Sequence, residues 1–344
     1  MEKMGEFRDS TPHKNNGSIL KERLNTDGYL FIKDLLPKQR VTAVRNRLLE
    51  KASRGGWFDV TEPLSNGVAN LSAACKDPEE KYMKVFRTMW RDEKLHRLRT
   101  HENVLELFQS IFGEPAFAHP MFVQRNIFPQ HGDFDFTTGA HQDKVHIGGD
   151  TNYAMWVPIG CCPLEKGPLA VASGSHMHGI LDTRVGTGAG GMDISGEIPG
   201  KWVTGEFNAG DVLIFCDTTV HKALPNRSKE IRQSFDARYQ PVSQQIARPN
   251  MAPYSGTGTW EEVYSEWESE ADQYYWEELD LDVVEFDRSY YEQRDEMAFE
   301  MAEKGDLLAR DTLLRIIQRD ANNEKIARAQ RLVAAMDNQN THRH

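Results

Sequence analysis

Apolar and polar positions follow different patterns in three parts of the chain. Residues 1–17 are polar and are expected to form a disordered tail. Immediately afterwards the pattern predicts a short helix, a turn at Asp27 and Gly28, and an apolar strand over residues 29–32. A second helix is expected after Pro37, because the apolar residues that follow recur on one helical face.

Between Phe117 and Val242 the pattern changes to short apolar runs separated by Gly, Pro and Asp. Many short strands with turn signals are typical of an antiparallel barrel or sandwich, whereas alternating strands and helices would indicate a parallel sheet. A length of 344 residues allows one such domain with an appendage. We therefore predict a mainly β fold with helical additions.

Beyond about Pro253 the chain becomes acidic, aromatic and helical in pattern. Trp260, Tyr264 and Trp267, for example, share one stripe of a predicted helix. Such stripes belong to a core or an interface more often than to a ligand site. Residues 253–344 are therefore expected to form a helical C-terminal extension that packs on the core or on a second subunit, the latter giving a homodimer.

Composition and charge narrow the classes of partner. Hydrophobic residues make up 39% of the chain and charged residues 27%, as in ordinary globular proteins. A net charge of −11 disfavours nucleic acid and acidic membranes as general partners and favours small molecules. The sequence has no apolar run long enough to cross a membrane, no signal-peptide pattern and no CxxC pair, so a cytoplasmic protein with reduced thiols is expected.

Two His-x-Asp units lie ten residues apart, His131 with Asp133 and His141 with Asp143. A non-haem iron site that activates O2 uses two His and one carboxylate and leaves positions open for other ligands. On a strand, residues i and i+2 point to the same side, so either unit would supply two ligands. The best donor of the third is His221, which we expect near the end of a buried strand.

A cosubstrate site is predicted from Arg232 and Ser234. Arg232 lies eleven residues after His221, and Ser234 shares its side of the expected strand. A guanidinium binds a carboxylate through two parallel hydrogen bonds. The pair would hold the distal carboxylate of 2-oxoglutarate.

Several segments resemble the phytanoyl-CoA dioxygenase family of iron(II)/2-oxoglutarate oxygenases. They are HQD at 141–143, GPLAVASGSH at 167–176, GDVLIFCDTTVHKALPNRS at 210–228 and RQS at 232–234, and the similarity spans roughly residues 20–242. The resemblance implies a double-stranded β-helix (a jelly roll, cupin-like), which we expect over residues 18–252 together with the N-terminal helices.

The resemblance also implies the cofactors Fe(II), 2-oxoglutarate and O2. The implied iron ligands are His141, Asp143 and His221, and the implied cosubstrate contacts are Arg232, Ser234 and Trp156. HQD matches the family motif and HGD does not, so His131 and Asp133 are second choices. His146 is more often a satisfied or solvent-facing residue than a ligand.

The implied reaction is oxidation, most simply hydroxylation, of a C–H bond in a small metabolite, as in secondary metabolism. Asp143 disfavours halogenation, because halogenating relatives have a small residue at this position. Lys144, Arg125 and Arg238 would suit an anionic substrate, although a solvated role is more common for such cations. Two alternatives are a metal-dependent cupin-type enzyme without 2-oxoglutarate and a non-catalytic binding or scaffolding barrel.

Overall fold

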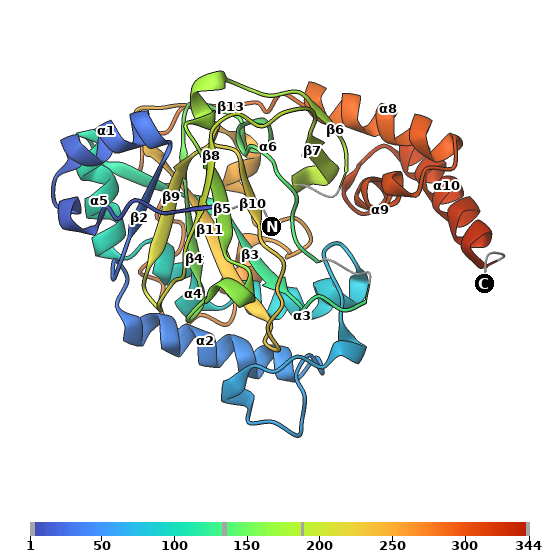
Figure 1. The fold of residues 1–344 in the computed structure, drawn as a ribbon, viewed down its shortest axis with the longest axis horizontal. Helices are drawn as coiled ribbons and strands as arrows, with labels where there is room; N and C mark the ends of the chain where they lie inside the picture. The colour runs from blue at the N-terminus through green and yellow to red at the C-terminus, as the bar shows by residue number, and fades with distance from the viewer. Residues whose placement is uncertain (1–3, 133–135, 187–188, 342–344) are drawn as a thin grey trace.

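The protein has a double-stranded β-helix core made of two sheets that face each other (Figure 1). The computed structural model describes residues 4–132, 136–186 and 189–341, without the side chains of 338–341. The larger sheet has the order β2 (Tyr29–Ile32), β9 (Val212–Cys216), β4 (Tyr153–Pro158), β11 (Arg232–Pro241) and β3 (Ala116–Ile127). The smaller sheet has the order β1 (Gly5–Glu6), β8 (Lys201–Thr204), β5 (Leu169–Ser173) and β10 (His221–Ala223). Within these two sheets all pairings are antiparallel except β1 with β8. The predicted fold class is confirmed.

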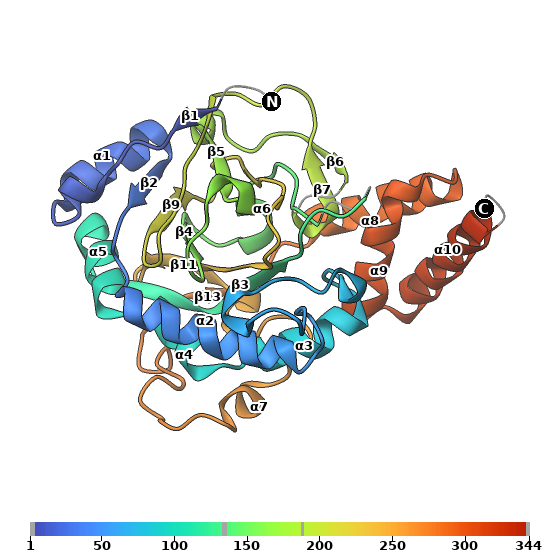
Figure 2. The same cartoon turned by 60° about the horizontal axis from the view of Figure 1, so that its bottom comes forward.

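The larger sheet is buried on both faces. On the inner face, Trp156 and Leu213 pack with Val171 and Val203 of the smaller sheet in one apolar cluster. Helices of the N-terminal half cover the outer face (Figure 2). They are α1 (Gly17–Asp27), α2 (Lys38–Ser53), α3 (Glu80–Trp90), α4 (Glu93–Arg99) and α5 (Glu102–Phe112). Burial on two faces explains why β9 reads as an unbroken apolar run.

The first elements follow from local sequence signals. The Asn16 side chain accepts a hydrogen bond from the Ile19 amide and caps the start of α1. Gly28, with φ 78°, ends the helix in the left-handed conformation, and β2 follows directly. The predicted helix, turn and strand are therefore confirmed.

The expectation of a disordered tail over residues 1–17 is wrong for residues 4–17. β1 adds to the smaller sheet beside β8, and Arg23 donates hydrogen bonds to the Asp9 carbonyl and the Ser10 hydroxyl. Polar composition misled the prediction, because this segment is held by backbone pairing and by one buried guanidinium. Phe7 adds an apolar contact, since its ring lies 5.2 Å from that of Phe31.

The C-terminal extension packs on the core in two parts. Aromatic residues around α7 (Trp260–Tyr264) join the cluster beneath the N-terminal helices, with the ring of Trp260 6.0 Å from that of Trp90. Helices α8 (Ser289–Glu303), α9 (Arg310–Arg319) and α10 (Asn323–Thr341) form a separate apolar cluster with the hairpin of β6 (Thr183–Val185) and β7 (Met192–Ile194). These helices project from one side of the barrel in Figures 1 and 2. Packing on the core is one of the two arrangements expected, and a homodimer stays a prediction.

The remaining elements are short. β12 (Ile246–Ala247) pairs with β13 (Val283–Val284), and α6 (Lys144–Ile147) lies between β3 and β4 in sequence. The 3-10 helices are η1 (Thr11–His13), η2 (Leu64–Asn66), η3 (Leu71–Ala73), η4 (Leu164–Lys166), η5 (Ser175–His178), η6 (Ala189–Gly191), η7 (Arg248–Met251) and η8 (Leu307–Ala309). None of the helices in the described ranges combines the length and apolarity that crossing a membrane requires.

Candidate metal centre

Three side chains from two distant segments of the chain converge in the cavity between the sheets. His141 and His221 form an antiparallel bridge in which each backbone N–H donates to the carbonyl of the other at 3.0 Å. With Asp143 they offer one ligand atom each, all within 4.8 Å of one another. Over the residues that the structure describes, this is the one group of His, Cys, Asp and Glu side chains with such geometry.

The local structure differs from the expected strand geometry. Asp143 does not lie on a strand but directly precedes α6, and the amides of Asp143 and Lys144 both donate to the Asp217 carbonyl at 2.9 Å. The apolar run of β9 ends at Cys216, and the chain then turns into the other sheet and starts β10 at His221. The His-x-Asp unit is thus positioned by the turn after β9 and not by alternation along a strand.

Hydrogen bonds orient both imidazoles. The Nδ1 atom of His141 donates to the Gly139 carbonyl at 2.8 Å, and that of His221 donates to the Thr219 carbonyl at 3.0 Å. The two Nε2 atoms are then directed to Asp143 Oδ1, at 3.7 and 3.9 Å. Burial lowers the pKa of both histidines, which keeps them in the neutral form that a metal ligand requires.

Asp143 is held by a buried arginine. Arg238 donates to Asp143 Oδ2 at 2.8 Å and, with its other terminal nitrogen, to Asp236 at 2.7 Å. Burial is the largest single influence and raises the pKa of Asp143, but the charge of Arg238 and the smaller effects of the nearby histidines together outweigh it, so the net pKa lies below its ordinary value. The carboxylate is therefore ionised, with one oxygen bound to Arg238 and the other facing the histidines.

Two of the three predicted cosubstrate residues line the cavity of this cluster, and Ser234 is not one of its lining residues. Arg232 and Trp156 line the same cavity as the three candidate ligands, and Arg232 donates to the Gly167 carbonyl. Ser234 is fully buried, and its hydroxyl has no hydrogen-bond partner among the described residues. The Ser234 hydroxyl lies two positions along the strand from the buried Arg232 guanidinium. Together these two donors would fit the carboxylate end of an organic diacid.

The structure separates the second-choice residues from the cluster. His131 is exposed and is not part of it, and Asp133 lies outside the described residues. His146 bonds through Nδ1 to the Tyr291 hydroxyl at 2.9 Å. Lys144 donates to the carbonyls of Gly149 and Asp150, which gives it a structural role.

Sequence reasoning missed Asp236 and Thr138, which also line the cavity. Asp236 continues the alternation that starts at Arg232, and this period-two signal was available in the sequence. Arg238 was considered as a substrate cation, but it is bonded to Asp143 and Asp236. Arg125 lines the cavity, and its Nε lies 3.9 Å from Asp236.

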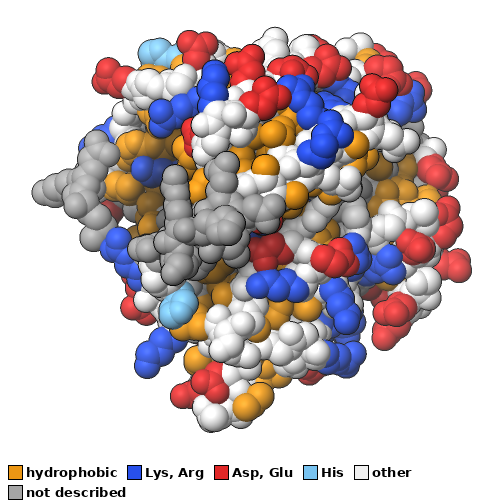
Figure 3. Space-filling model, turned by 90° about the vertical axis from the view of Figure 1, so that its right-hand side faces the viewer, with side chains coloured by type: hydrophobic (Ala, Val, Ile, Leu, Met, Phe, Trp, Pro, Cys, Tyr) orange, Lys and Arg blue, Asp and Glu red, His pale blue; other side chains and the backbone are white. Residues whose placement is uncertain are grey.

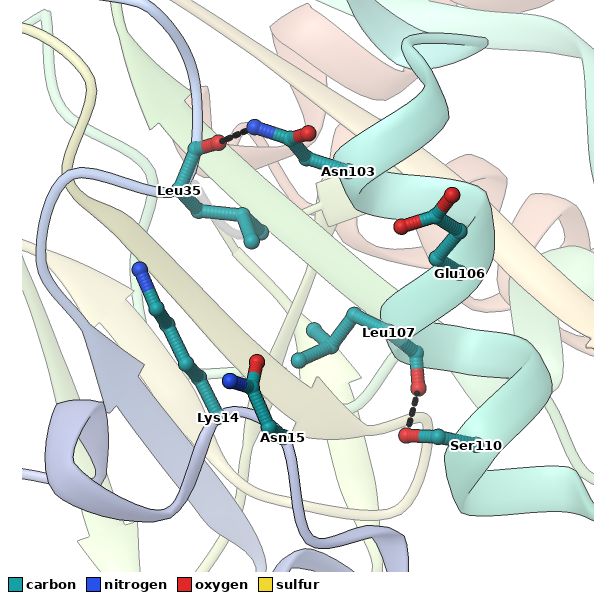
Figure 4. A pocket seen from close by; sticks show the side chains of 7 residues that line it. All are labelled: Lys14, Asn15, Leu35, Asn103, Glu106, Leu107 and Ser110. Atoms are coloured by element: carbon teal, nitrogen blue, oxygen red, sulfur yellow. Dashed lines mark hydrogen bonds between the residues drawn. The ribbon is translucent and has the colours of Figure 1, made fainter.

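A different cavity lies between the N-terminal segment and α5 (Figure 4). Asn103 donates to the Leu35 carbonyl at its edge, and Ser110 donates to the Leu107 carbonyl of the same helix. None of the predicted site residues lines this cavity. The candidate chemistry therefore belongs to the cavity between the sheets.

A jelly-roll fold with two histidines and one carboxylate facing one point defines the class of mononuclear non-haem iron enzymes. A sequence model of the phytanoyl-CoA dioxygenase (PhyH) family matches residues 24–234. The match covers more than half of the chain, which therefore belongs to this family. The protein is an Fe(II)/2-oxoglutarate-dependent oxygenase, with Fe(II), 2-oxoglutarate and O2 as cofactors.

The curated relatives include two 1-deoxypentalenic acid 11-beta-hydroxylases. The protein from Streptomyces arenae is 25% identical over 253 residues, which is 69% of this chain and 86% of that protein. The protein from Streptomyces exfoliatus is 25% identical over 260 residues, covering 70% and 87%. Among solved structures, the epimerase SnoN with Fe3+ and alpha-ketoglutarate has a TM-score of 0.49 at 21% identity, over 68% of this chain and 86% of that one. The non-heme monooxygenase ThoJ has a TM-score of 0.49 at 20% identity, over 66% and 79%.

Proposed function

We propose that this protein hydroxylates a C–H bond of a small metabolite, with His141, Asp143 and His221 as the iron ligands. The observation that carries this proposal is the orientation of the cluster. Both histidine Nδ1 atoms are bound to backbone carbonyls, so both Nε2 atoms face Asp143, and the three ligand atoms all lie within 4.8 Å of one another. Three protein ligands on one side would leave positions for the cosubstrate and O2.

We assign the 2-oxoglutarate contacts to Arg232, Ser234 and Trp156. Arg232 and Ser234 would bind the distal carboxylate, and the buried Trp156 would form an apolar wall. When bound, iron and 2-oxoglutarate together activate O2 for attack on an unreactive C–H bond and yield succinate and CO2. The surrounding residues keep Asp143 ionised and the two histidine ligands neutral, orient the 2-oxoglutarate and exclude water. The buried hydroxyl of Ser234 beside Arg232 favours this function over a cupin-type enzyme that uses no 2-oxoglutarate.

The proposed substrate is a natural-product intermediate with an acidic group. The curated relatives are named as hydroxylases of a carboxylic acid, 1-deoxypentalenic acid, and Arg125 lines the cavity here. Asp143 supports hydroxylation and not halogenation, because the carboxylate occupies the position that chloride would need. We also propose a cytoplasmic location and, as a further prediction, a homodimer formed through the C-terminal helices.

Anaerobic addition of Fe(II) and 2-oxoglutarate tests this function directly. We expect a weak charge-transfer band in the visible spectrum, and then succinate release on admission of O2. A protein that binds iron but shows no band with 2-oxoglutarate would contradict the cosubstrate assignment. Succinate release measured over a panel of metabolites would identify the substrate.

A further inference from the structure

We propose that the C-terminal extension forms an anion-binding subsite for the acidic group of the substrate, in a cavity between α8, α9 and α6. This inference rests on the proposed function, since it assigns a place to the substrate of that same site. The cavity has a volume of about 250 Å³, and four arginines line it, Arg288, Arg294, Arg315 and Arg319. All four arginines lie beyond residues 24–234, the range that matches the family model, whereas His146 and Gly190 of the cavity wall lie within it.

Positive charge exceeds negative charge around this cavity. Arg315 and Arg319 share Asp77, Arg294 and Lys325 share Asp295, and Arg288 and Lys325 share Asp320. Five cations are thus paired with three carboxylates, and of these carboxylates only Asp320 lines the cavity. Figure 3 shows the side of the molecule that carries the C-terminal helices, where acidic and basic side chains are mixed on the outer surface. The whole chain has a net charge of −11, yet four arginines line this one cavity. Such a local excess of positive charge favours an anionic ligand.

Arg315 is the central residue of the proposed subsite. Its Nη1 atom lies 3.4 Å from Asp77 Oδ2, and its buried Nε atom has no hydrogen-bond partner among the described residues. Asp77 is bound more closely by Arg319, at 2.8 and 3.1 Å. Arg315 therefore has donor capacity left for a ligand, and a carboxylate or phosphate is the group that fits a guanidinium fork.

The proposed subsite is close to the metal centre. His146 lines the cavity and lies three residues after Asp143, so about one helical turn separates the candidate ligand from the cavity wall. Arg315 also lines a neighbouring cavity, which shares Arg125 and Thr138 with the cavity of the metal centre. If the acidic group of the substrate binds to Arg315, carbon atoms several bonds from that group would lie toward the iron.

The side chains around the arginines indicate an organic anion. Phe286, Tyr291 and Ile316 supply apolar and aromatic surface in the same cavity. The guanidinium carbon of Arg294 lies 4.7 Å from the centre of the Tyr291 ring, which orients that arginine. The structure therefore assigns this subsite to a carboxylate or phosphate carried on an apolar skeleton.

Calorimetric titration of the Fe(II)- and 2-oxoglutarate-loaded protein, kept anaerobic, tests the subsite. The probes are benzoate, phenyl phosphate and the neutral benzamide. We expect both anions to bind at least about tenfold more tightly than benzamide, with the tighter of the two showing whether carboxylate or phosphate is preferred. Equal affinity for benzoate, phenyl phosphate and benzamide, or no binding of either anion, would overturn the proposal.

Matched variants locate the binding. Arg315→Gln should weaken anion binding about tenfold or more, and it should fold because Asp77 keeps Arg319. Arg288→Ala, at a side chain that is 61% exposed, should weaken it severalfold without disturbing the core. Arg310→Gln is the control, because Arg310 lies on the same helix but pairs with Asp337 and does not line the cavity. Equal loss in the Arg310 control, or no loss in Arg315→Gln, would refute the assignment. Absence of the charge-transfer band in the wild-type protein would instead contradict the proposed function.

Discussion

At the scale of single residues, Arg238 fixes the orientation of the Asp143 carboxylate toward the two histidines. The guanidinium binds Asp143 Oδ2 and Asp236 together, so it fixes the carboxylate and balances its charge in a buried place. Mutation of a residue that hydrogen-bonds to a metal ligand commonly lowers the metal affinity by about ten- to a hundredfold. Arg238→Gln should therefore weaken Fe(II) binding by about that factor in an anaerobic titration. Arg238→Lys should recover part of the loss, whereas unchanged affinity in both variants would show that Asp143 needs no such support.

Arg232 provides a second prediction at this scale. The Arg232 guanidinium is buried and is not one of the three candidate metal ligands. Its removal should therefore affect the cosubstrate and leave the metal in place. We expect Arg232→Ala to raise the KM for 2-oxoglutarate by at least about a hundredfold, the loss of a charge-assisted pair in a buried site. Iron content, measured in parallel, should stay near one per chain. A KM that does not change would remove Arg232 from the cosubstrate site.

At the scale of elements, the sequence predicts strands better than it predicts how they join. The strands around Trp156 and Ser234 could be recognised as short runs between turn signals, and both are buried along nearly their whole length. The sheet change between Cys216 and His221 could not, because a turn between two apolar runs looks the same whether the next strand stays in the sheet or leaves it. The ordered segment before α1 was missed for a similar reason, since β1 depends on a partner about 200 residues away.

The C-terminal extension gives an element-scale prediction. Truncation after residue 252 removes Trp260 and Trp276, which pack on the cluster that contains Trp90. The exposed aromatic surface should lower solubility and increase binding of a hydrophobic dye. Truncation after Arg288 keeps these aromatics and uncovers only the small cluster around β6 and β7. We expect the longer protein to be clearly the better behaved, and equal dye binding by both truncations would show that the aromatic segment covers no core.

At the scale of the whole molecule, the core imposes neutrality on several histidines. His96 and His119 are buried outside the metal centre, and their partners are the Trp90 carbonyl and the Gln240 side chain. Neither partner carries a negative charge that would stabilise a protonated ring. Acid should therefore destabilise this protein even where its carboxylates are still ionised.

Urea unfolding at several pH values measures this effect. Burial lowers the pKa of His119 to about 3, from 6.5 in the unfolded chain, although the hydrogen bond to Gln240 raises it slightly. The unfolded chain then binds more protons as the pH falls, so the stability is fully present above pH 6.5 and is lost progressively toward pH 3. One unit below pH 6.5, each such imidazole should cost about 1.4 kcal/mol of unfolding free energy. His119→Gln, which keeps a hydrogen bond to Gln240, should flatten the dependence between pH 7.5 and 5.5 by about that amount. Parallel pH profiles for the variant and the wild type would show that His119 is protonated with little penalty and that the core tolerates its charge.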